Sequence, residues 1–371
     1  MLGELFGQNA AIVAVRRALA SGNLPGAYLI VGPDGVGKSA VAASFARAAA
    51  CLTPRSDPFD ACGACDSCHR AAQGAHPDII TIGPSGEQLQ IWQLWSRPGR
   101  PPGAVSRTLS FAPVIGRRRV YILEQADRLT ESAANSLLKV LEEPPPYALF
   151  LLLAPHPARM LPTILSRCQV VRLRAVPAAE LSAYLQREQG IEPERADMLA
   201  AYAEGRIGQA LTLARSTAVA DEIARVLDYA EGLPGAPAHR ALRAAEQLRK
   251  LAAQTKALLG EEPVEPAEGA DTDAPSAKEK TGRRQFAAVL DLLVAFYRDL
   301  LAVRAGAGHE ALVHRERAEA LDRLAAYGEP GRWTACLDAL LLARRRLDAN
   351  ANVALVTDTL LMRLLSSGDR K

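Results

Sequence analysis

Apolar residues along this 371-residue chain form short runs in its first half and longer periodic patterns afterwards. Four runs rich in branched and aromatic residues are typical of buried strands, namely 27–31, 120–123, 149–153 and 170–173. Helical patterns lie between them, as in the alanine-rich stretch 38–50 and in 133–143, which three prolines end. Strands that alternate with helices predict an α/β fold with a parallel sheet covered by helices on both faces.

From about Ala175 onward the strand signals stop and helical patterns take over. Two long amphipathic stretches, 286–304 and 333–365, predict an all-helical C-terminal region. The segment 260–284 that precedes them is rich in Glu, Pro and Ala and has few large apolar groups. Such a composition buries too little surface to fold, so we expect a disordered loop or linker there.

Composition excludes several classes of protein. The net charge of +3 argues against a polybasic nucleic-acid binder, so any contact with DNA must be local. The start, Met1-Leu2-Gly3-Glu4, is unlike a signal peptide, and the apolar run 148–154 has the length of a strand, not of a membrane span. Six cysteines, four of them clustered, favour metal ligation in a reducing compartment. We therefore expect a cytoplasmic protein with no membrane contact.

A complete phosphate-binding loop follows the first strand. It reads Gly-Pro-Asp-Gly-Val-Gly-Lys-Ser and fits the pattern G-x-x-x-x-G-K-S/T. In such a loop Gly32, Gly35 and Gly37 let backbone amides approach the phosphates, while Lys38 neutralises their charge and Ser39 holds Mg²⁺. ATP with Mg²⁺ is the candidate ligand. The alternative is a chance match, or a loop of the same geometry that binds nothing.

The strand 120–123 ends in Glu124-Gln125, where a hydrolytic P-loop enzyme places two acids. One acid supports Mg²⁺ and the other orients the attacking water. Glu124 can serve the metal, although its side chain is longer than that of aspartate, whereas Gln125 cannot act as a base. Because losing a general base costs about 10²–10⁴ in rate, we expect at most weak hydrolysis here.

Four cysteines directly behind the loop have the spacing C-x10-C-x2-C-x2-C: Cys51, Cys62, Cys65 and Cys68. Two-residue gaps let neighbouring thiolates turn toward one ion, and four sulfur ligands make a closed, structural zinc site. Such a site contributes about 10–16 kcal/mol of apparent binding free energy. The alternatives are free thiols or a disulfide pair, and His69 and His76 are competing ligands.

Two further features are open to opposite interpretations. Arg167, in Ser-Arg-Cys before the last strand, is either a solvated surface residue or an arginine finger for a neighbouring subunit's γ-phosphate, whereas Cys168 is expected in the core. Six arginines between 97 and 119 either contact DNA phosphates or are solvated loop charges. Trp92 and Trp95 are at helical spacing, which favours packing over base stacking.

Together these residues resemble the clamp-loader AAA+ family of bacterial DNA polymerase III. The resemblance runs from Gly7-Gln8 to the C-terminus apart from 260–284. Its marks are Ala27-Tyr28-Leu29, the P-loop, the cysteine spacing, 134–139 leading into Leu-Glu-Glu-Pro-Pro at 141–145, and Ser166-Arg167-Cys168. Two subunit types in the family carry all of them: the gamma/tau motor ATPase and the delta-prime subunit.

Departures from the motor pattern make the chain resemble the delta-prime type. The motor's Asp-Glu pair corresponds to Glu124-Gln125, and the polar residues after its next strand correspond to Ala154-Pro155. The motor's sensor arginine falls near Gly208, and Arg206 is two residues out of register, so no role is carried over to it. The stretches 109–111 and 116–122, with Ala126-Asp127, also look like delta-prime. The intact P-loop, by contrast, argues against the delta-prime type and for the motor type.

The resemblance implies three domains: an AAA+ core at 1–173 with a zinc module at 51–68, a helical lid at 174–222, and a helical collar at 223–371. It implies a ring in which the chain presents Arg167 to an adjacent gamma/tau motor and helps position delta, which opens the sliding clamp on primer-template DNA. Its own ATPase would then be negligible. The rival hypotheses are a motor ATPase that hydrolyses its own nucleotide and a zinc-dependent DNA-binding protein outside replication.

Overall fold

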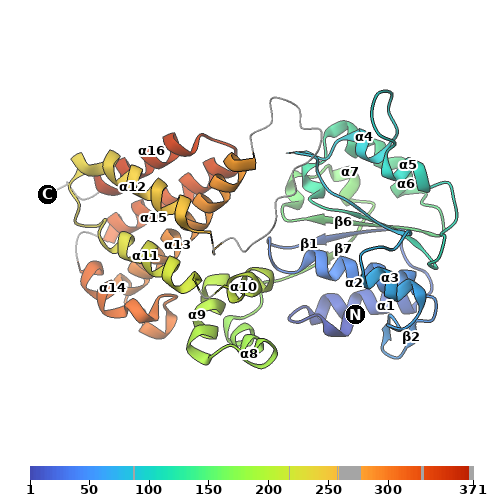
Figure 1. Cartoon of the computed structure of the whole chain (residues 1–371), viewed down its shortest axis with the longest axis horizontal. Coiled ribbons are helices and arrows are strands. Elements are labelled where there is room, and N and C mark those ends of the chain that lie inside the picture. Colours follow the sequence, from blue (N-terminus) through green and yellow to red (C-terminus); the bar gives the residue numbers. More distant parts are fainter. Residues whose placement is uncertain (87, 217, 257, 259–276, 327–329, 367–371) are drawn as a thin grey trace. The chain divides into compact units, whose positions relative to one another are not determined.

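The computed structural model describes residues 1–86, 88–216, 218–256, 258, 277–326 and 330–366 (Figure 1). The chain divides into two compact units. The first comprises Met1–Leu181 with Glu204–Gln209, and the second comprises Ser182–Ala203 with Ala210–Lys371. In the described residues, no helix is both long and apolar enough to cross a membrane.

The first unit is built around a five-stranded parallel sheet (Figure 1). Its strands lie in the order β4 (Ile79–Ile82), β5 (Arg119–Leu123), β6 (Ala148–Ala154), β1 (Ala27–Val31) and β7 (Gln169–Arg172). The four strands expected from apolar runs are present, and the prediction of a parallel sheet is confirmed. Every residue of β1, β5 and β6 is buried, as a parallel sheet covered on both faces requires.

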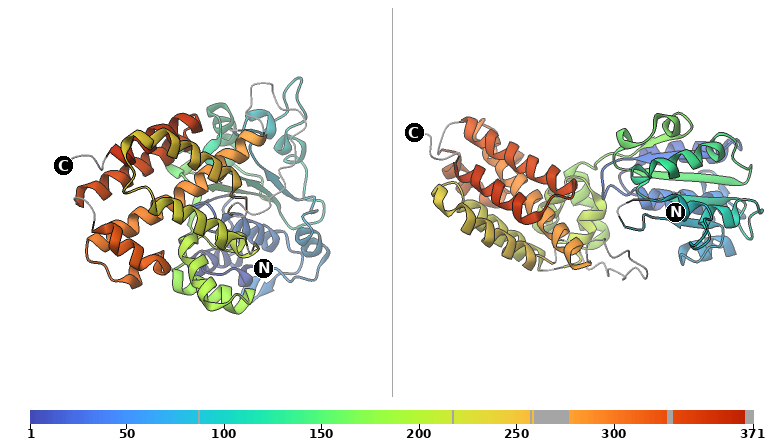
Figure 2. Two further views of the ribbon diagram at one scale, coloured as in Figure 1. Left: turned by 60° about the vertical axis from the view of Figure 1, so that its left-hand side comes forward. Right: turned by 90° about the horizontal axis from the view of Figure 1, so that it is seen from above.

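Helices cover both faces of this sheet (Figure 2). Alternate residues of β1 point to opposite faces, so Tyr28 and Ile30 share one core with helices α1 (Asn9–Ala20) and α2 (Lys38–Ala50). Leu29 and Val31 belong to the other core, which α6 (Glu131–Glu142) helps to form. Short helices complete the unit: α3 (Asp66–Ala72), α4 (Ile91–Leu94), α5 (Ala104–Thr108) and α7 (Pro162–Leu165). A small hairpin, β2 (Arg55–Ser56) with β3 (Phe59–Asp60), stands apart from the sheet.

A buried ion pair fixes the loop that leads into β5. The Asp78 carboxylate lies 2.8 Å from Nη2 of Arg119 and accepts hydrogen bonds from the amides of Val114, Ile115 and Gly116. Burial by itself would raise the pKa of Asp78, but these four donors hold it below its usual value. Arg119 also donates to the carbonyls of residues 108, 111 and 112. This arginine of the basic stretch therefore has a structural role.

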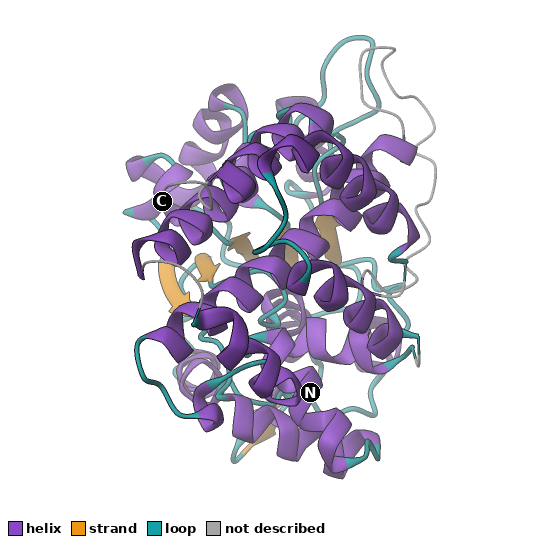
Figure 3. Cartoon of the chain, turned by 90° about the vertical axis from the view of Figure 1, so that its left-hand side faces the viewer, coloured by secondary structure: helices purple, strands orange, loops and turns teal. Residues whose placement is uncertain are grey.

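The second unit is entirely helical in its described residues (Figure 3). Its helices are α8 (Ala178–Gln189), α9 (Pro193–Ala203), α10 (Ile207–Ala214), α11 (Val219–Glu231), α12 (Ala241–Gln254), α13 (Ala277–Arg304), α14 (Ala318–Ala325), α15 (Pro330–Asp348) and α16 (Val353–Ser366). The first residues of α8 and of α10 belong to the first unit. The expected helical C-terminal region is confirmed. The single stretch predicted at 333–365 is instead two helices, because the chain turns at Asn350, which has a φ of 62°.

Two boundary predictions need comment. Helix α13 begins at Ala277, so the end of the segment 260–284 is helical and not a linker, while residues 260–276 lie outside the described residues. The three-domain division stays a prediction. Of the predicted lid at 174–222, Glu204–Gln209 groups with the first unit and most of the remainder with the second.

Candidate functional site

The glycine-rich loop joins β1 to the start of α2. Gly35 and Gly37 have φ values of 77° and 102°, a region that glycine adopts without steric cost. Among the described residues, none accepts a hydrogen bond from the backbone amides of Gly35, Gly37, Lys38 or Ser39. Unpaired amides at the N-terminus of a helix suit an anion, so this geometry fits a phosphate group.

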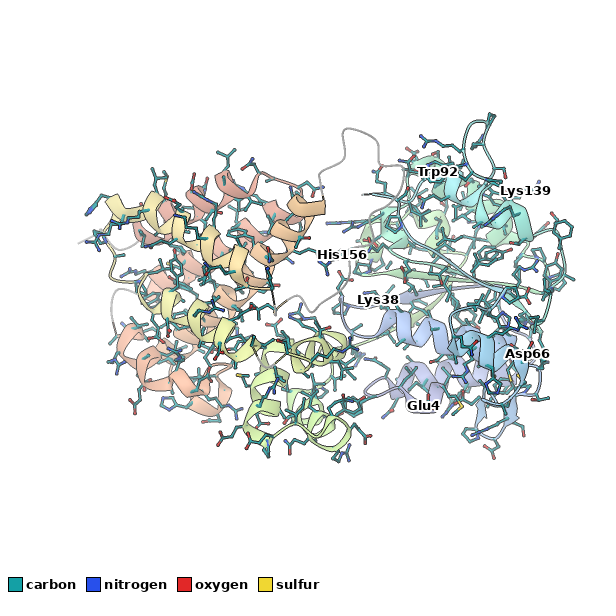
Figure 4. The ribbon with its side chains drawn as sticks, in the orientation of Figure 1. Glu4, Lys38, Asp66, Trp92, Lys139 and His156 are labelled. Atoms are coloured by element: carbon teal, nitrogen blue, oxygen red, sulfur yellow. The ribbon has the colours of Figure 1, made fainter. Side chains whose placement is uncertain are left out.

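The ammonium group of Lys38 is bound to its own loop (Figure 4). Its Nζ donates to the carbonyl oxygens of Gly32 and Pro33 at 2.8 and 2.9 Å, and it pairs with Asp34 at 3.0 Å. A phosphate carries more negative charge than these carbonyls. A bound nucleotide would therefore draw Lys38 away from the loop.

A segment of the predicted lid packs on the same loop within the first unit. The amide of Gly208 donates to the carbonyl of Gly35 at 2.8 Å, and a Cβ at Gly208 would lie only 3.1 Å from that oxygen. Arg206 also lies against Gly35, since its Cβ is 3.3 Å from where a Gly35 side chain would begin. Sequence register gave Arg206 no role, yet the fold places it beside the phosphate-binding loop.

The second expected site residue, Glu124, follows β5 at the carboxyl edge of the sheet. Only β6 separates β5 from β1, so Glu124 and the P-loop are at the same edge. Its Oε2 is 3.5 Å from where a Cβ would stand at Gly83, which leaves little room for a larger residue there. Gln125 has a φ of 51° and begins a 3₁₀ turn. A glutamine amide has no carboxylate with which to take a proton from water.

The four cysteines of the predicted zinc module converge at the far end of α2 from Lys38, next to Asp66 (Figure 4). Their four sulfur atoms lie within 4.8 Å of one another, and the Cys51–Cys65 and Cys62–Cys68 separations are both 3.9 Å. Disulfide sulfurs would be about 2.05 Å apart, whereas four thiolates around zinc at about 2.3 Å stand about 3.8 Å apart. The cluster therefore has the dimensions of a tetrahedral metal site.

Hydrogen bonds to the sulfur atoms support the same conclusion. The Thr53 side chain and the amides of Ala64 and Cys65 lower the pKa of Cys62 to about 5, which favours the thiolate that a metal needs. Burial raises the pKa of Cys51 to about 12, so a thiolate at that position requires a cation close by. The residues present fit a metal ion.

The histidines weighed as competing ligands are placed elsewhere. Nε2 of His76 lies 2.9 Å from the Ser67 hydroxyl, and its Nδ1 accepts a hydrogen bond from the amide of Asp78. Both ring nitrogens are therefore occupied by structural contacts. Ser67 in turn donates to the last carbonyl of α2, at Ala50, which ties α3 to that helix end. His69 is exposed and is not part of the metal-sized cluster.

Arg167 lies on the surface just after α7. Its Nε donates to Oε1 of Glu142 at 2.8 Å, its Nη2 contacts the same oxygen, and its Nη1 donates to Thr163 and Ser166. The side chain is 32% exposed, so it is accessible to another molecule. The guanidinium is thus held in place by Glu142 and remains within reach of a neighbouring chain. Cys168, by contrast, is buried in the core, as expected.

Both tryptophans of the basic stretch make packing contacts. Trp95 donates its indole N–H to Ser136 at 3.0 Å, and the Arg100 guanidinium lies over the Trp92 ring at 5.4 Å. These contacts agree with the interpretation of Trp92 and Trp95 as packing residues. Arginine stacked on an aromatic face also leaves that face unavailable to a nucleic-acid base.

Comparison with known proteins shows what this chain is similar to. Residues 7–177 match the family model described as DNA polymerase III, delta subunit. The delta-prime subunit of Bacillus subtilis is 28% identical over 338 residues, which cover 91% of this chain and 90% of that protein. The delta-prime subunit of Pseudomonas aeruginosa is 39% identical over 142 residues, 38% of this chain and 41% of that protein. The chain therefore resembles the clamp-loader subunits of bacterial DNA polymerase III.

The two types of similar protein differ in how much of this chain they match. The tau subunit of Escherichia coli is 32% identical over 215 residues, which span 57% of this chain but only 32% of tau. The similarity to the Bacillus subtilis delta-prime subunit instead covers 91% of the chain, and so it extends into the helical second unit.

Proposed function

We propose that this chain is a delta-prime-type subunit of the clamp loader, which loads the sliding clamp onto primed DNA during replication. Its partners are the gamma/tau motor subunits and delta, and through them the clamp and primer-template DNA. In this role it supplies Arg167 to ATP bound by a neighbouring motor. The similarity to a delta-prime subunit over 91% of the chain supports this assignment, and it implies a cytoplasmic protein.

The observation that carries the proposal is the contrast between two residues. Gln125 stands where a motor has a catalytic acid, whereas Arg167 is an accessible guanidinium on the surface of the first unit. A chain that has an arginine finger but no general base can complete the ATPase site of another subunit more readily than its own ATPase site. For Arg167 to act as the finger, its guanidinium must leave the Glu142 carboxylate and bind a phosphate oxygen instead.

The P-loop and the cysteines take supporting roles in this proposal. Gly32, Gly35, Gly37, Lys38 and Ser39 would hold the phosphates of ATP, with Glu124 on its Mg²⁺, in a site that binds without turning over. Zinc at the four cysteines would be structural, because four sulfur ligands leave no open coordination position for catalysis. The proposed role requires a core at 1–173, a lid at 174–222 and a collar at 223–371, a division that stays a prediction.

The rival candidate is a gamma/tau-type motor, and the intact P-loop favours it. ATP hydrolysis by the purified chain alone separates the two functions. We expect negligible turnover without partners, because Gln125 cannot activate water, and restored turnover once gamma/tau and delta are added. Co-elution of the chain with gamma/tau and delta on gel filtration is the accompanying control. Brisk hydrolysis by the isolated chain would identify a motor and contradict the proposal.

A further inference from the structure

The first unit contains a cavity of about 330 Å³ that is distinct from the P-loop. Arg117 and Arg118, just before β5, and Tyr147, just before β6, form one side of it. Strands β5 and β6 begin at this edge of the sheet, whereas the P-loop follows the end of β1 at the opposite edge. Phe59 contributes a wall from the β2–β3 hairpin of the cysteine segment.

Two guanidinium groups line the cavity without a compensating acid. Arg117 is exposed, and in the described part of the chain no residue forms an ion pair or side-chain hydrogen bond with it. Arg118 donates to the carbonyl of Pro146 at 2.9 Å and has no carboxylate partner among the described residues. Burial and the nearby charge of Arg117 both lower the pKa of Arg118. None of the described residues that line the cavity is acidic.

Apolar side chains also line the cavity, although polar atoms make up the larger part of its surface. They belong to Leu19, Leu24, Ala48, Ala49 and Phe59. A volume near 330 Å³ is at the lower end of the range for small-molecule sites, so it fits one or two fused rings. A lining that combines two guanidinium groups with apolar side chains favours a ligand that has both a charged group and an apolar body.

We propose that this cavity binds a small organic anion, with a single carboxylate, sulfonate or phosphate against Arg117 and Arg118 and an apolar body against Phe59 and the leucines. Guanidinium groups suit such anions because they donate several hydrogen bonds in a fixed plane. The P-loop site is chemically different, since it offers backbone amides and one ammonium. The inference concerns another edge of the sheet and does not depend on the proposed function.

A purely structural role is the competing explanation. Arg117 lies beside the last carbonyl of α2, because its backbone amide donates to Ala50 at 3.1 Å. Positive charge near a helix C-terminus stabilises the helix. In that case replacing the arginine would lower the melting temperature and leave the affinity for an anion unchanged.

Calorimetric titration of the full zinc-loaded chain with naphthalene-2-sulfonate tests the site. We expect one bound anion per chain, and about tenfold weaker binding for Arg117→Gln, the loss of one charged contact. Arg118→Gln should act in the same direction. Arg107→Gln, an exposed arginine of the same stretch that does not line the cavity, is the matched control and should bind like the wild type.

Two comparison ligands sharpen the result, one without the charge and one without the apolar body. Naphthalene-2-sulfonamide has the same rings without the charge and should bind at least about tenfold more weakly than the sulfonate. Inorganic phosphate, which lacks the apolar body, should also bind more weakly. Equal affinity of the sulfonate for the wild type and Arg117→Gln would overturn the proposal, as would equal affinity for the two naphthalene probes or no binding at millimolar sulfonate. Because Arg117 is exposed, its variant should fold even if Arg118→Gln does not.

Discussion

Replacing Arg167 by alanine should lower ATP hydrolysis by about 10³–10⁵-fold at the motor site that this chain completes. In the proposed role the guanidinium stabilises charge on the transferring phosphate, and alanine has no group that can do so. Lysine is a poor substitute, since it lacks the planar fork of donors, so Arg167→Lys should also be strongly impaired.

The measurement is steady-state ATPase of the reconstituted loader with clamp and primed DNA. Arg159→Ala, another exposed arginine in the segment between β6 and β7, is the matched control and should retain activity. Folding is not expected to suffer, because the Arg167–Glu142 pair is exposed and such pairs contribute about 0–1 kcal/mol. Unchanged ATP turnover in Arg167→Ala would contradict the proposal that Arg167 is an arginine finger.

Removing the metal from the four-cysteine cluster should unfold the segment between the end of α2 and α3. The expected loss is large, because structural zinc contributes about 10–16 kcal/mol of apparent binding free energy. Without the ion, the buried Cys51 thiol and its three neighbours have no common partner. The N-terminus should loosen as well, because the amides of Leu2 and Gly3 donate to Asp60 in the cysteine segment.

Elemental analysis and thermal unfolding check this prediction. The purified chain should hold one zinc ion, and a chelator or Cys65→Ser should remove it and lower the melting temperature. Cys168→Ala, which changes a buried cysteine outside the cluster, should keep its zinc. A chain that has no zinc and keeps its melting temperature after chelation would contradict the assignment.

Local patterns of apolar residues in the sequence predicted most of the fold. The buried runs predicted β1, β5, β6 and β7 because continuous apolar stretches suit a sheet covered on both faces. Strand β4 (Ile79–Ile82) was missed, because it is a short strand at the edge of the sheet and only its last residue is buried. The turn at Asn350 was missed too. Asn350 has a φ of 62°, and the Asn352 side chain accepts hydrogen bonds from the amides of Ala354 and Leu355 at the start of α16.

The candidate site was predictable where its residues are adjacent in sequence. The P-loop and the cysteine spacing are local motifs, whereas the Arg167–Glu142 and Asp78–Arg119 pairs join residues 25 and 41 positions apart. In neither pair does the sequence around one residue indicate which distant residue it will contact. The same reason hid the contact of Gly208 with the P-loop and the arginine-lined cavity, because both depend on how distant segments pack.

The most direct test of the central claim is Lys38→Ala in the reconstituted loader, measured as ATPase with clamp and primed DNA. The account holds that this chain completes a neighbour's site and does not turn over ATP itself. It predicts that Lys38→Ala leaves turnover nearly intact, while Arg167→Ala in the same assay sharply lowers it. Loss of most of the activity in Lys38→Ala would show that the chain is a motor and contradict the account.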